Sequence, residues 1–447
     1  MKCIRTLNLK VLSIGILAIV SSCQPDKPIV NSPNLDLSDH TLIKNWYSLS
    51  LELGPKCNGF EEPIMARSLA YYSILVHESV YRGIPDLKSL KGSSGAFNFN
   101  FPQPDLSYEY NWTTVANEAS KVYFENIYGS GTNAKQRIQS IYQNIFNRFS
   151  KGLDSVVLAN SKLYGRELAF AVLNYAAEDG QSEAYLDVFT NSYTIPTGEG
   201  KWIPTTPDYS PRPMLPYWGK VRPILNQNVD VILLNKELNY SNSSSSIMYS
   251  EAVEIYNMAL AMTEQEKEAA AYFNRDMGAM SQALYHNYLL AIQLMAENQL
   301  DFPKSLELMS KLSFALHDGN IACYKYIYTN NLLRASTYIR QNINRIYQPE
   351  YKSLPIPEGI SDKSVCYSIG AEILSNFFGY RQSFTDNTQV ERPDLRNKSK
   401  QFDSFQQFSI EATQGDIYTG IHFRTSIDAG RKLGTDIARN TINFINK

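Results

Sequence analysis

Four polar residues, Ser361, Asp362, Lys363 and Ser364, stand directly before a run of small and apolar residues that continues to Leu374. The N–H groups in the first turn of a helix have no partner within the helix, so they bind a capping side chain or an anion. Ser361 and Asp362 are types that cap helices, with a contribution of about 1 kcal/mol. The stretch therefore predicts either an ordinary capped helix or a helix N-terminus that cradles an oxyanion.

Helices must position these residues, because apolar residues recur at three- and four-residue spacing along most of the chain. The run from Glu62 to Tyr81 has Pro63 in its first turn, where proline suits a helix. Similar runs predict helices at 112–128, 132–149, 154–178, 249–261, 264–275, 277–298, 303–328, 333–346, 363–378, 402–413 and 421–445. No comparable stretch alternates with period two. The sequence therefore predicts an all-α fold, a large helical bundle in a single domain over residues 36–447.

One long segment, from about 180 to 247, interrupts the helical pattern. It contains seven prolines, at positions 196, 204, 207, 211, 213, 216 and 223. Proline is excluded from helix interiors, so this segment is expected to be an ordered excursion over the helical core.

Two further stretches belong with the first one, at residues 314–340 and 411–430. In chain order the three resemble the vanadium-dependent haloperoxidases and the related type 2 phosphatidic acid phosphatases, a family that binds vanadate or phosphate between helices. The segments at 200–207, 216–219 and 377–379 are similar to connecting segments of bacterial members. The resemblance extends from about Asn45 to Asn446 and implies a helical bundle of the vanadium chloroperoxidase type.

The resemblance implies roles for four residues of this chain. Arg334 and Ser361 match residues that bind the anion in the family. His422 stands where relatives place the His that bonds vanadium or attacks phosphorus, and Lys363 occupies the position of the acid/base His. His422 and Lys363 are therefore the candidate catalytic residues.

Three other pocket positions depart from the family pattern, since Ile327 replaces a Lys, Asp362 a Gly and Asp416 an Arg. An Asp within about 5 Å of an oxyanion would repel it by roughly 3 kcal/mol at an effective dielectric of about 20. With Arg334 and Lys363 set against the two Asp residues, the side-chain charge of the pocket falls to about zero. We therefore predict a degraded pocket in which these cations pair with the Asp residues, no bound cofactor, and a non-catalytic binding or structural role.

Two interpretations of the site stay open beside this one. An active vanadium-dependent haloperoxidase, or an acid phosphatase-type phosphoesterase with an altered site, requires the retained cations and Ser361 to converge on vanadate or phosphate. A metal site made of Asp362, Asp416 and His422 mixes suitable ligand types, but the nearby cations oppose it and no metal is expected.

A binding protein is the main competitor to an enzyme. Aromatic residues of the excursion, Trp202, Tyr217 and Trp218, are expected to line the pocket mouth, where they would suit an uncharged or sugar-like ligand. The partner is then an unknown small molecule or protein. Nucleic acid is not expected, because 42 basic and 44 acidic residues give a formal net charge of −2 and no attracting field.

The N-terminus has the layout of a secretory signal. Three basic residues among the first ten precede an apolar run that is too short to span a bilayer. The ending Val20-Ser-Ser-Cys23 resembles the lipobox of bacterial lipoproteins, which implies cleavage before Cys23 and lipidation of its thiol. Residues 1–22 are thus a predicted signal peptide and 23–35 a flexible tether. Gln24 favours an outer-membrane location in the cell envelope, facing the periplasm or the surface, and an ordinary signal peptide is the alternative.

Five cysteines occur, and removal of the signal and of lipidated Cys23 leaves Cys57, Cys323 and Cys366. Three cysteines cannot form a complete disulfide framework, although one pair is possible. Their spacing lacks the close repeats of a zinc site.

Overall fold

The computed structural model describes residues 35–93, 97–130, 132–230, 238–274, 282–349, 351–418 and 420–445. The predicted signal peptide, Cys23 and all of the tether except Leu35 lie outside these ranges. The described residues contain fourteen α-helices and one two-stranded sheet, which confirms the all-α fold class. None of the helices within these ranges has the length and apolar character needed to cross a membrane.

The helices follow the periodicity of the sequence, with ends shifted by a few residues. They are α1 (Thr41–Leu53), α2 (Glu62–Val80), α3 (Trp112–Tyr128), α4 (Thr132–Phe149), α5 (Ser155–Ala177), α6 (Asn226–Asp230), α7 (Ile247–Ala261), α8 (Glu264–Phe273), α9 (Gln282–Glu297), α10 (Phe302–Asn330), α11 (Ala335–Asn342), α12 (Asp362–Phe378), α13 (Phe405–Tyr418) and α14 (Arg424–Ile445). The strands β1 (Phe384–Asp386) and β2 (Lys400–Phe402) pair antiparallel, with Phe384 opposite Phe402. Helices α1 and α6 were not predicted. In α1, Leu49, Leu51 and Leu53 alternate with polar residues and obscure the helical period, and the five-residue α6 lies in the segment that was expected to interrupt the helices.

The chain forms two compact units. The first contains the described residues up to 58 together with 74–90 and 100–174. In it, α3 packs against α4 and α1 packs against both. Trp46 of α1 is fully buried and donates a hydrogen bond from Nε1 to Oδ1 of Asn117 at 3.1 Å. This unit holds none of the predicted site residues.

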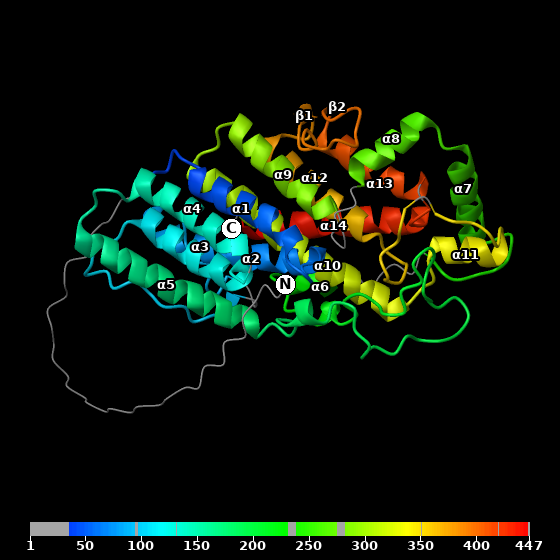
Figure 1. Ribbon diagram of the computed structural model, residues 1–447, viewed down its shortest axis with the longest axis horizontal. Helices are drawn as coiled ribbons and strands as arrows, with labels where there is room; N and C mark the ends of the chain where they lie inside the picture. Colours follow the sequence, from blue (N-terminus) through cyan, green and yellow to red (C-terminus); the bar gives the residue numbers. More distant parts are fainter. Residues whose placement is uncertain are drawn as a thin grey trace. The chain divides into compact units, whose positions relative to one another are not determined.

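The second unit contains residues 59–73, the described part of 91–99, and the chain from 175 onward. Its longest helix, α10, begins at the N-cap Asp301, which accepts a hydrogen bond from the Lys304 N–H at 2.9 Å. It ends where Asn331 adopts a left-handed backbone with φ of 50°. Helix α10 packs against α12 and α14, and α12 also packs against α13 and α9 (Figure 1). All predicted site residues within the described ranges belong to this unit, and the single domain over 36–447 stays a prediction.

Two glycines let α14 lie directly on the first turns of α12. A Cβ at Gly430 would stand 2.6 Å from the Ser361 carbonyl oxygen, and one at Gly434 would stand 2.4 Å from that of Val365. Any larger residue would therefore push the two helices apart. The Ser361 N–H also donates to the Ser426 carbonyl at 3.0 Å, so the start of α12 is fixed against α14.

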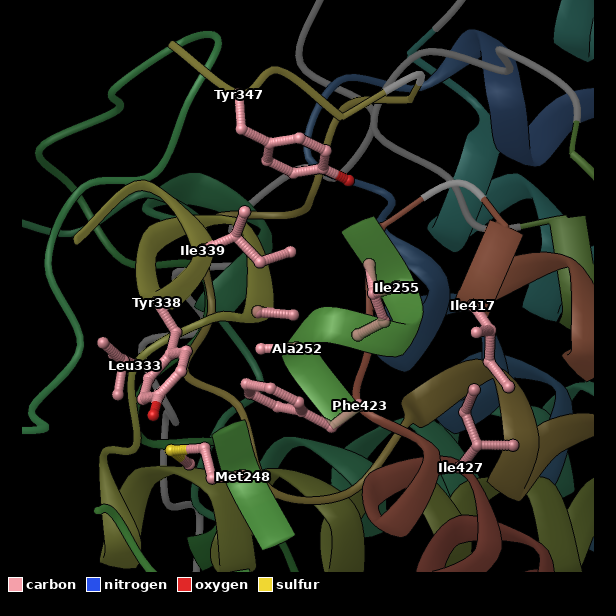
Figure 2. Close-up of a cluster of buried hydrophobic side chains, with 11 residues drawn as sticks. Met248, Ala252, Ile255, Leu333, Tyr338, Ile339, Tyr347, Ile417, Phe423 and Ile427 are labelled. Carbon is pink, nitrogen blue, oxygen red and sulfur yellow. The ribbon is translucent and has the colours of Figure 1, made fainter. Parts of the chain in front are cut away.

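An apolar cluster packs beside the predicted site residues. Figure 2 shows side chains of α7 facing those of α11 and of the α13–α14 region. The members, each at most 6% exposed, are Met248, Ala252, Ile255, Leu333, Ala335, Tyr338, Ile339, Tyr347, Ile417, Phe423 and Ile427. Leu333, Ile417 and Phe423 directly adjoin Arg334, Asp416 and His422 in the chain, so the packing of this cluster restrains three site segments at once.

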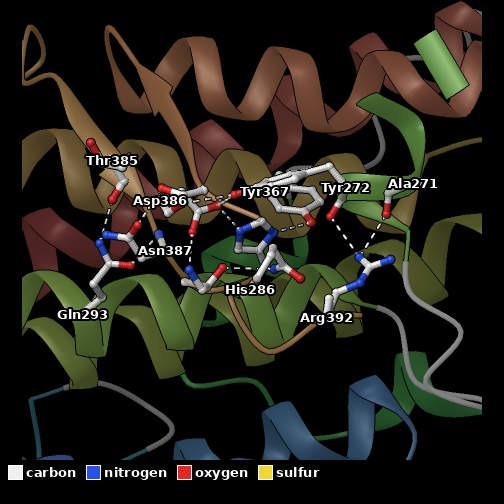
Figure 3. Close-up of polar contacts among 12 residues, drawn as sticks. Ala271, Tyr272, His286, Gln293, Tyr367, Thr385, Asp386, Asn387 and Arg392 are labelled. Carbon is white, nitrogen blue, oxygen red and sulfur yellow. Dashed lines mark hydrogen bonds and ion pairs between the residues drawn. The ribbon is translucent and has the colours of Figure 1, made fainter. Parts of the chain in front are cut away.

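A buried polar group ties β1 to α8, α9 and α12 (Figure 3). His286 Nε2 lies 2.6 Å from Asp386 Oδ2, and His286 Nδ1 lies 3.1 Å from the Tyr367 hydroxyl. The Tyr272 hydroxyl donates to the same Asp386 oxygen at 2.9 Å. His286 and Asp386 have no exposed side-chain surface. Arg392 completes the group at the end of α8, where it donates to the Ala271 carbonyl at 2.9 Å.

The carboxylate of Asp386 gives a test of this group. Burial alone would raise its pKa, but the charge of His286 and the hydrogen bonds to Asp386 lower that pKa to about 2. A carboxyl with a depressed pKa stabilises the fold above its ordinary value of 3.8, and this stability is lost as pH falls through about 2. We expect Asp386→Asn to lower the free energy of unfolding at pH 5, and the deficit to shrink by about 1 kcal/mol at pH 3.

Urea unfolding at both pH values measures the effect. The matched control is Asp428→Asn, because the Asp428 side chain is 57% exposed and its loss should change little at either pH. A deficit for Asp386→Asn that is the same at pH 5 and pH 3 would contradict the role assigned to the buried pair.

Candidate functional site

The predicted site residues come from three segments that meet in the second unit. Arg334 is the N-cap residue of α11, Ser361 is the N-cap residue of α12, and His422 lies between α13 and α14. The Ser361 hydroxyl accepts a hydrogen bond from the Ser364 N–H at 3.1 Å. This is an ordinary helix cap, so at least one free N–H group of the helix start is bound by the chain itself.

Lys363 and Asp416 form one buried ion pair. Lys363 Nζ lies 2.7 Å from Asp416 Oδ1 and also donates to Asn274 Oδ1 at 2.6 Å. The Asp416 side chain is fully buried and that of Lys363 is 10% exposed. The predicted pairing of Lys363 with an Asp is therefore confirmed, and the ammonium group is held by two acceptors.

His422 lies between two carboxylates. Its Nδ1 is 2.9 Å from Glu358 Oε1, and its Nε2 is 3.5 Å from Asp362 Oδ1. Arg334 Nε lies 3.4 Å from the other Glu358 oxygen, Oε2. Arg334 was expected to pair with one of the two Asp residues, and this expectation is wrong because its carboxylate partner is Glu358. Asp362 instead faces His422.

Charge, and not solvent, sets the protonation of this group. Burial alone would lower the pKa of His422, but the Glu358 charge and hydrogen bonds to Asp362 and Glu358 raise that pKa to about 9. Burial would also raise the pKa of Glu358 and of Asp362, yet in both cases the charges of His422 and Arg334 hold the pKa below its ordinary value. At neutral pH an imidazolium is therefore hydrogen-bonded to Glu358 and forms an ion pair with Asp362.

Glu358 is the residue that the sequence analysis missed. It stands only three positions before Ser361, but nothing in the local sequence distinguishes it from a loop acid. The fold buries it completely. Its N–H donates to the Leu332 carbonyl at 2.8 Å, and the two residues form a β-bridge. That bridge brings the Glu358 segment beside the chain that leads into Arg334.

The two remaining substituted positions, Ile327 and Asp362, both lie in helices. Ile327 is fully buried in α10, and Asp362 is the first residue of α12. A carboxylate in the first turn of a helix is favourable because of the helix dipole. The structure therefore gives Asp362 two stabilising surroundings, the helix start and His422. The catalytic roles suggested for His422 and Lys363, and the anion-binding roles suggested for Arg334 and Ser361, stay predictions.

The residues present do not fit an oxyanion such as vanadate. Three cations, Arg334, Lys363 and His422, are balanced by three carboxylates, Glu358, Asp362 and Asp416. A negative group entering here would meet two carboxylates that already face Arg334 and His422. Repulsion from one carboxylate at about 5 Å amounts to roughly 3 kcal/mol at an effective dielectric of about 20.

No metal centre replaces the anion in the described part of the chain, where no group of three or more His, Cys, Asp or Glu is arranged to hold an ion. Asp362 and Asp416, which were considered as ligands with His422, have separate cationic partners. The Cys323 and Cys366 thiols are free and buried, and burial raises the pKa of each.

The aromatic residues of the excursion differ from the prediction. Trp202 and Trp218 do not line an open mouth, because both are fully buried. Tyr217 does line a cavity of about 470 Å³, formed mainly by residues 180–192 and 215–217. The parts of the proline-rich excursion that carry Trp202 and Trp218 are therefore packed into the core of the unit.

The described residues form an all-α protein in which charged side chains from the ends of several helices converge. A family model described as the VCPO second helical-bundle domain matches residues 307–447, the part that carries every predicted pocket residue. The structure of a bacterial vanadium-dependent iodoperoxidase is similar, with a TM-score of 0.78, 25% identity, and coverage of 94% of this chain and 98% of that chain. No curated protein matches this chain.

Two further structures share the fold. An apo-type bacterial vanadium-dependent chloroperoxidase gives a TM-score of 0.65 at 12% identity, covering 86% of this chain and 93% of that one. A holo-type bacterial vanadium-dependent chloroperoxidase gives 0.59 at 11% identity, covering 95% and 94%. These two structures show the shared fold alone. The family model over residues 307–447 and the iodoperoxidase support the vanadium haloperoxidase superfamily for this chain.

The raised pKa of His422 makes stability depend on pH in a defined window. A group whose pKa rises from 6.5 to about 9 on folding stabilises the protein fully below pH 6.5 and loses that contribution as pH rises through 9. We expect His422→Gln to be less stable than the unmodified protein at pH 6. Between pH 6 and pH 9 the difference should fall by about 3 kcal/mol.

Urea unfolding at pH 6 and pH 9 measures this difference. His317→Gln is the control, because His317 is fully buried in the same unit while burial lowers its pKa to about 4. Its stability difference should therefore change by less than about 1 kcal/mol between pH 6 and pH 9, and in the opposite direction. A deficit for His422→Gln that does not change between the two pH values would show that the ring is not held as an imidazolium.

Proposed function

We propose that this protein is a lipid-anchored protein of the bacterial cell envelope that keeps the vanadium haloperoxidase scaffold without vanadium-dependent catalysis, and that it has a binding or structural role. The observation that carries the proposal is the charge balance of the pocket. Arg334 and His422 both face the buried carboxylate of Glu358. A site with this balance lacks the surplus positive charge that stabilises developing negative charge in catalysis.

The neighbouring ion pair supports the same proposal. Lys363, at the position of the acid/base residue, is held by Asp416 and Asn274. An ammonium group that donates to a buried carboxylate and to a half-buried amide oxygen is poorly suited to exchange protons with a substrate near neutral pH. Both candidate catalytic side chains thus have their hydrogen-bonding capacity directed at the protein.

An active haloperoxidase or phosphoesterase with an altered site is the second candidate. It is supported by the retained Arg334, Ser361 and His422 and by the 25% identity to a bacterial vanadium-dependent iodoperoxidase over most of both chains. The two candidates differ in one property, which is whether the intact site binds an oxyanion.

Calorimetric titration of residues 36–447 with vanadate and with phosphate distinguishes them. We expect no binding by the unmodified protein, because the carboxylates repel the anion. We expect measurable binding by the double variant Asp362→Gly/Asp416→Arg, since two negative charges are removed and one positive charge is added. Micromolar binding of vanadate by the unmodified protein would overturn the proposal and make halide-oxidation and phosphate-ester assays the next step.

The lipid anchor is tested with the full-length chain and Cys23→Ser expressed in a bacterial host. We expect the unmodified protein to partition into the detergent phase and to incorporate a clickable fatty acid, and the variant to do neither. Equal partitioning and equal labelling of the two proteins would exclude lipidation at Cys23.

A further inference from the structure

We infer that the Glu358 carboxylate is a built-in ligand that takes the place of a small external anion between Arg334 and His422, so that the protein contains a latent site for formate-sized carboxylates and for phosphate. This inference rests on the proposed function, because it requires that the intact protein binds no external oxyanion. Beyond the proposed function, it names the Glu358 carboxylate as the group that fills the site.

The carboxylate contacts two cations through different oxygens. Glu358 Oε1 lies 2.9 Å from His422 Nδ1, and Oε2 lies 3.4 Å from Arg334 Nε. Arg334 is 1% exposed, His422 is 2% exposed, and Glu358 is fully buried. The two cations are therefore screened from water, and Glu358 is the carboxylate that both of them face.

The backbone holds Glu358 in this position. Its N–H donates to the Leu332 carbonyl, and Leu332 also bridges to Lys201, so three segments pair side by side. Gly359 follows with φ of 142°, and a Cβ there would stand 2.9 Å from the Tyr326 ring. This turn requires glycine and leads the chain into the N-cap of α12.

Arg334 retains donors that Glu358 does not fill. Its Nε and Nη1 are buried and have no hydrogen-bond partner among the described residues, and Glu358 Oε2 has none either. The approach at 3.4 Å is thus an ion pair without hydrogen-bond geometry. Unfilled buried donors are destabilising and rare in native proteins. A mobile anion with two or more oxygens could reach this guanidinium better than a carboxylate tied to the backbone.

Removal of the Glu358 carboxylate tests the inference. Glu358→Ala leaves Arg334 and His422 facing only Asp362, with a net charge of +1 and a space of the size of the lost group. Formate, acetate and phosphate are added separately to this variant, with chloride at matched ionic strength as the salt control. We expect formate to raise the Tm in a saturable manner by at least about 2 °C, while chloride has no comparable effect.

Four comparison proteins show which group the added anion replaces. The unmodified protein and Glu358→Gln should not respond to formate, because the site is filled in both. Glu372→Ala removes another buried carboxylate, whose partner Arg439 is 59% exposed, and should not respond either. Arg334→Met/Glu358→Ala keeps the space but lacks the guanidinium, and its response should be lost.

The outcomes separate the inference from the proposed function. Stabilisation of Glu358→Ala by formate supports the inference, and added stabilisation by phosphate extends the site to tetrahedral anions. Equal responses of Glu358→Ala and Glu372→Ala to formate would overturn the inference.

If Glu358→Ala does not fold alone, the yield of refolded protein is compared with and without formate. Formate-dependent recovery supports the inference, and equal or no recovery overturns it. Vanadate binding by the unmodified protein would instead defeat the proposed function itself.

Discussion

Buried charges that must be compensated are the constraint on which the centre of this structure depends. Arg334, Lys363 and His422 are each at most 8% exposed. Burial of one uncompensated ion costs several kcal/mol, and removal of one partner from a buried pair costs about 3 to 5 kcal/mol. The carboxylates that balance these cations come from the Glu358 loop, the start of α12 and the end of α13. The helices must therefore dock correctly before the charges are satisfied, and the satisfied charges in turn specify how they dock.

Close helix contact makes this balance possible. Gly430 and Gly434 bring α14 against the first turns of α12. The apolar cluster to which α7 contributes contains the residues next to Arg334, Asp416 and His422 and restrains them. None of these contacts involves an anion. The scaffold can therefore be kept while the chemistry of its centre changes, which agrees with 94% coverage of this chain at only 25% identity to the iodoperoxidase. Packing sets the fold, and a few side chains set the charge of the site.

Much of this architecture could be predicted from local patterns, because helices bury periodic faces and the period is visible in the sequence. The capping role of Ser361 and the pairing of Lys363 with Asp416 follow from residue types once the segments are known to meet. Glu358 could not be predicted, since its partner His422 is 64 residues away and its backbone partner Leu332 is equally invisible in the local sequence. Trp202 and Trp218 were misjudged for a related reason. Proline excludes a helix, but it does not tell whether a segment lies on the surface or in the core.

A carboxylate carried by the chain differs from a dissolved anion in the entropy of binding. A free anion loses translational freedom when it enters a site, and its occupancy depends on its concentration outside. Glu358 has lost that freedom already on folding, so its effective concentration at Arg334 and His422 is set by the backbone and is independent of the medium. Under the proposed function, the charge balance of the core is then the same whether or not phosphate is present. The fold gains independence from an external ion, and it gives up the open cationic site that an oxyanion would require.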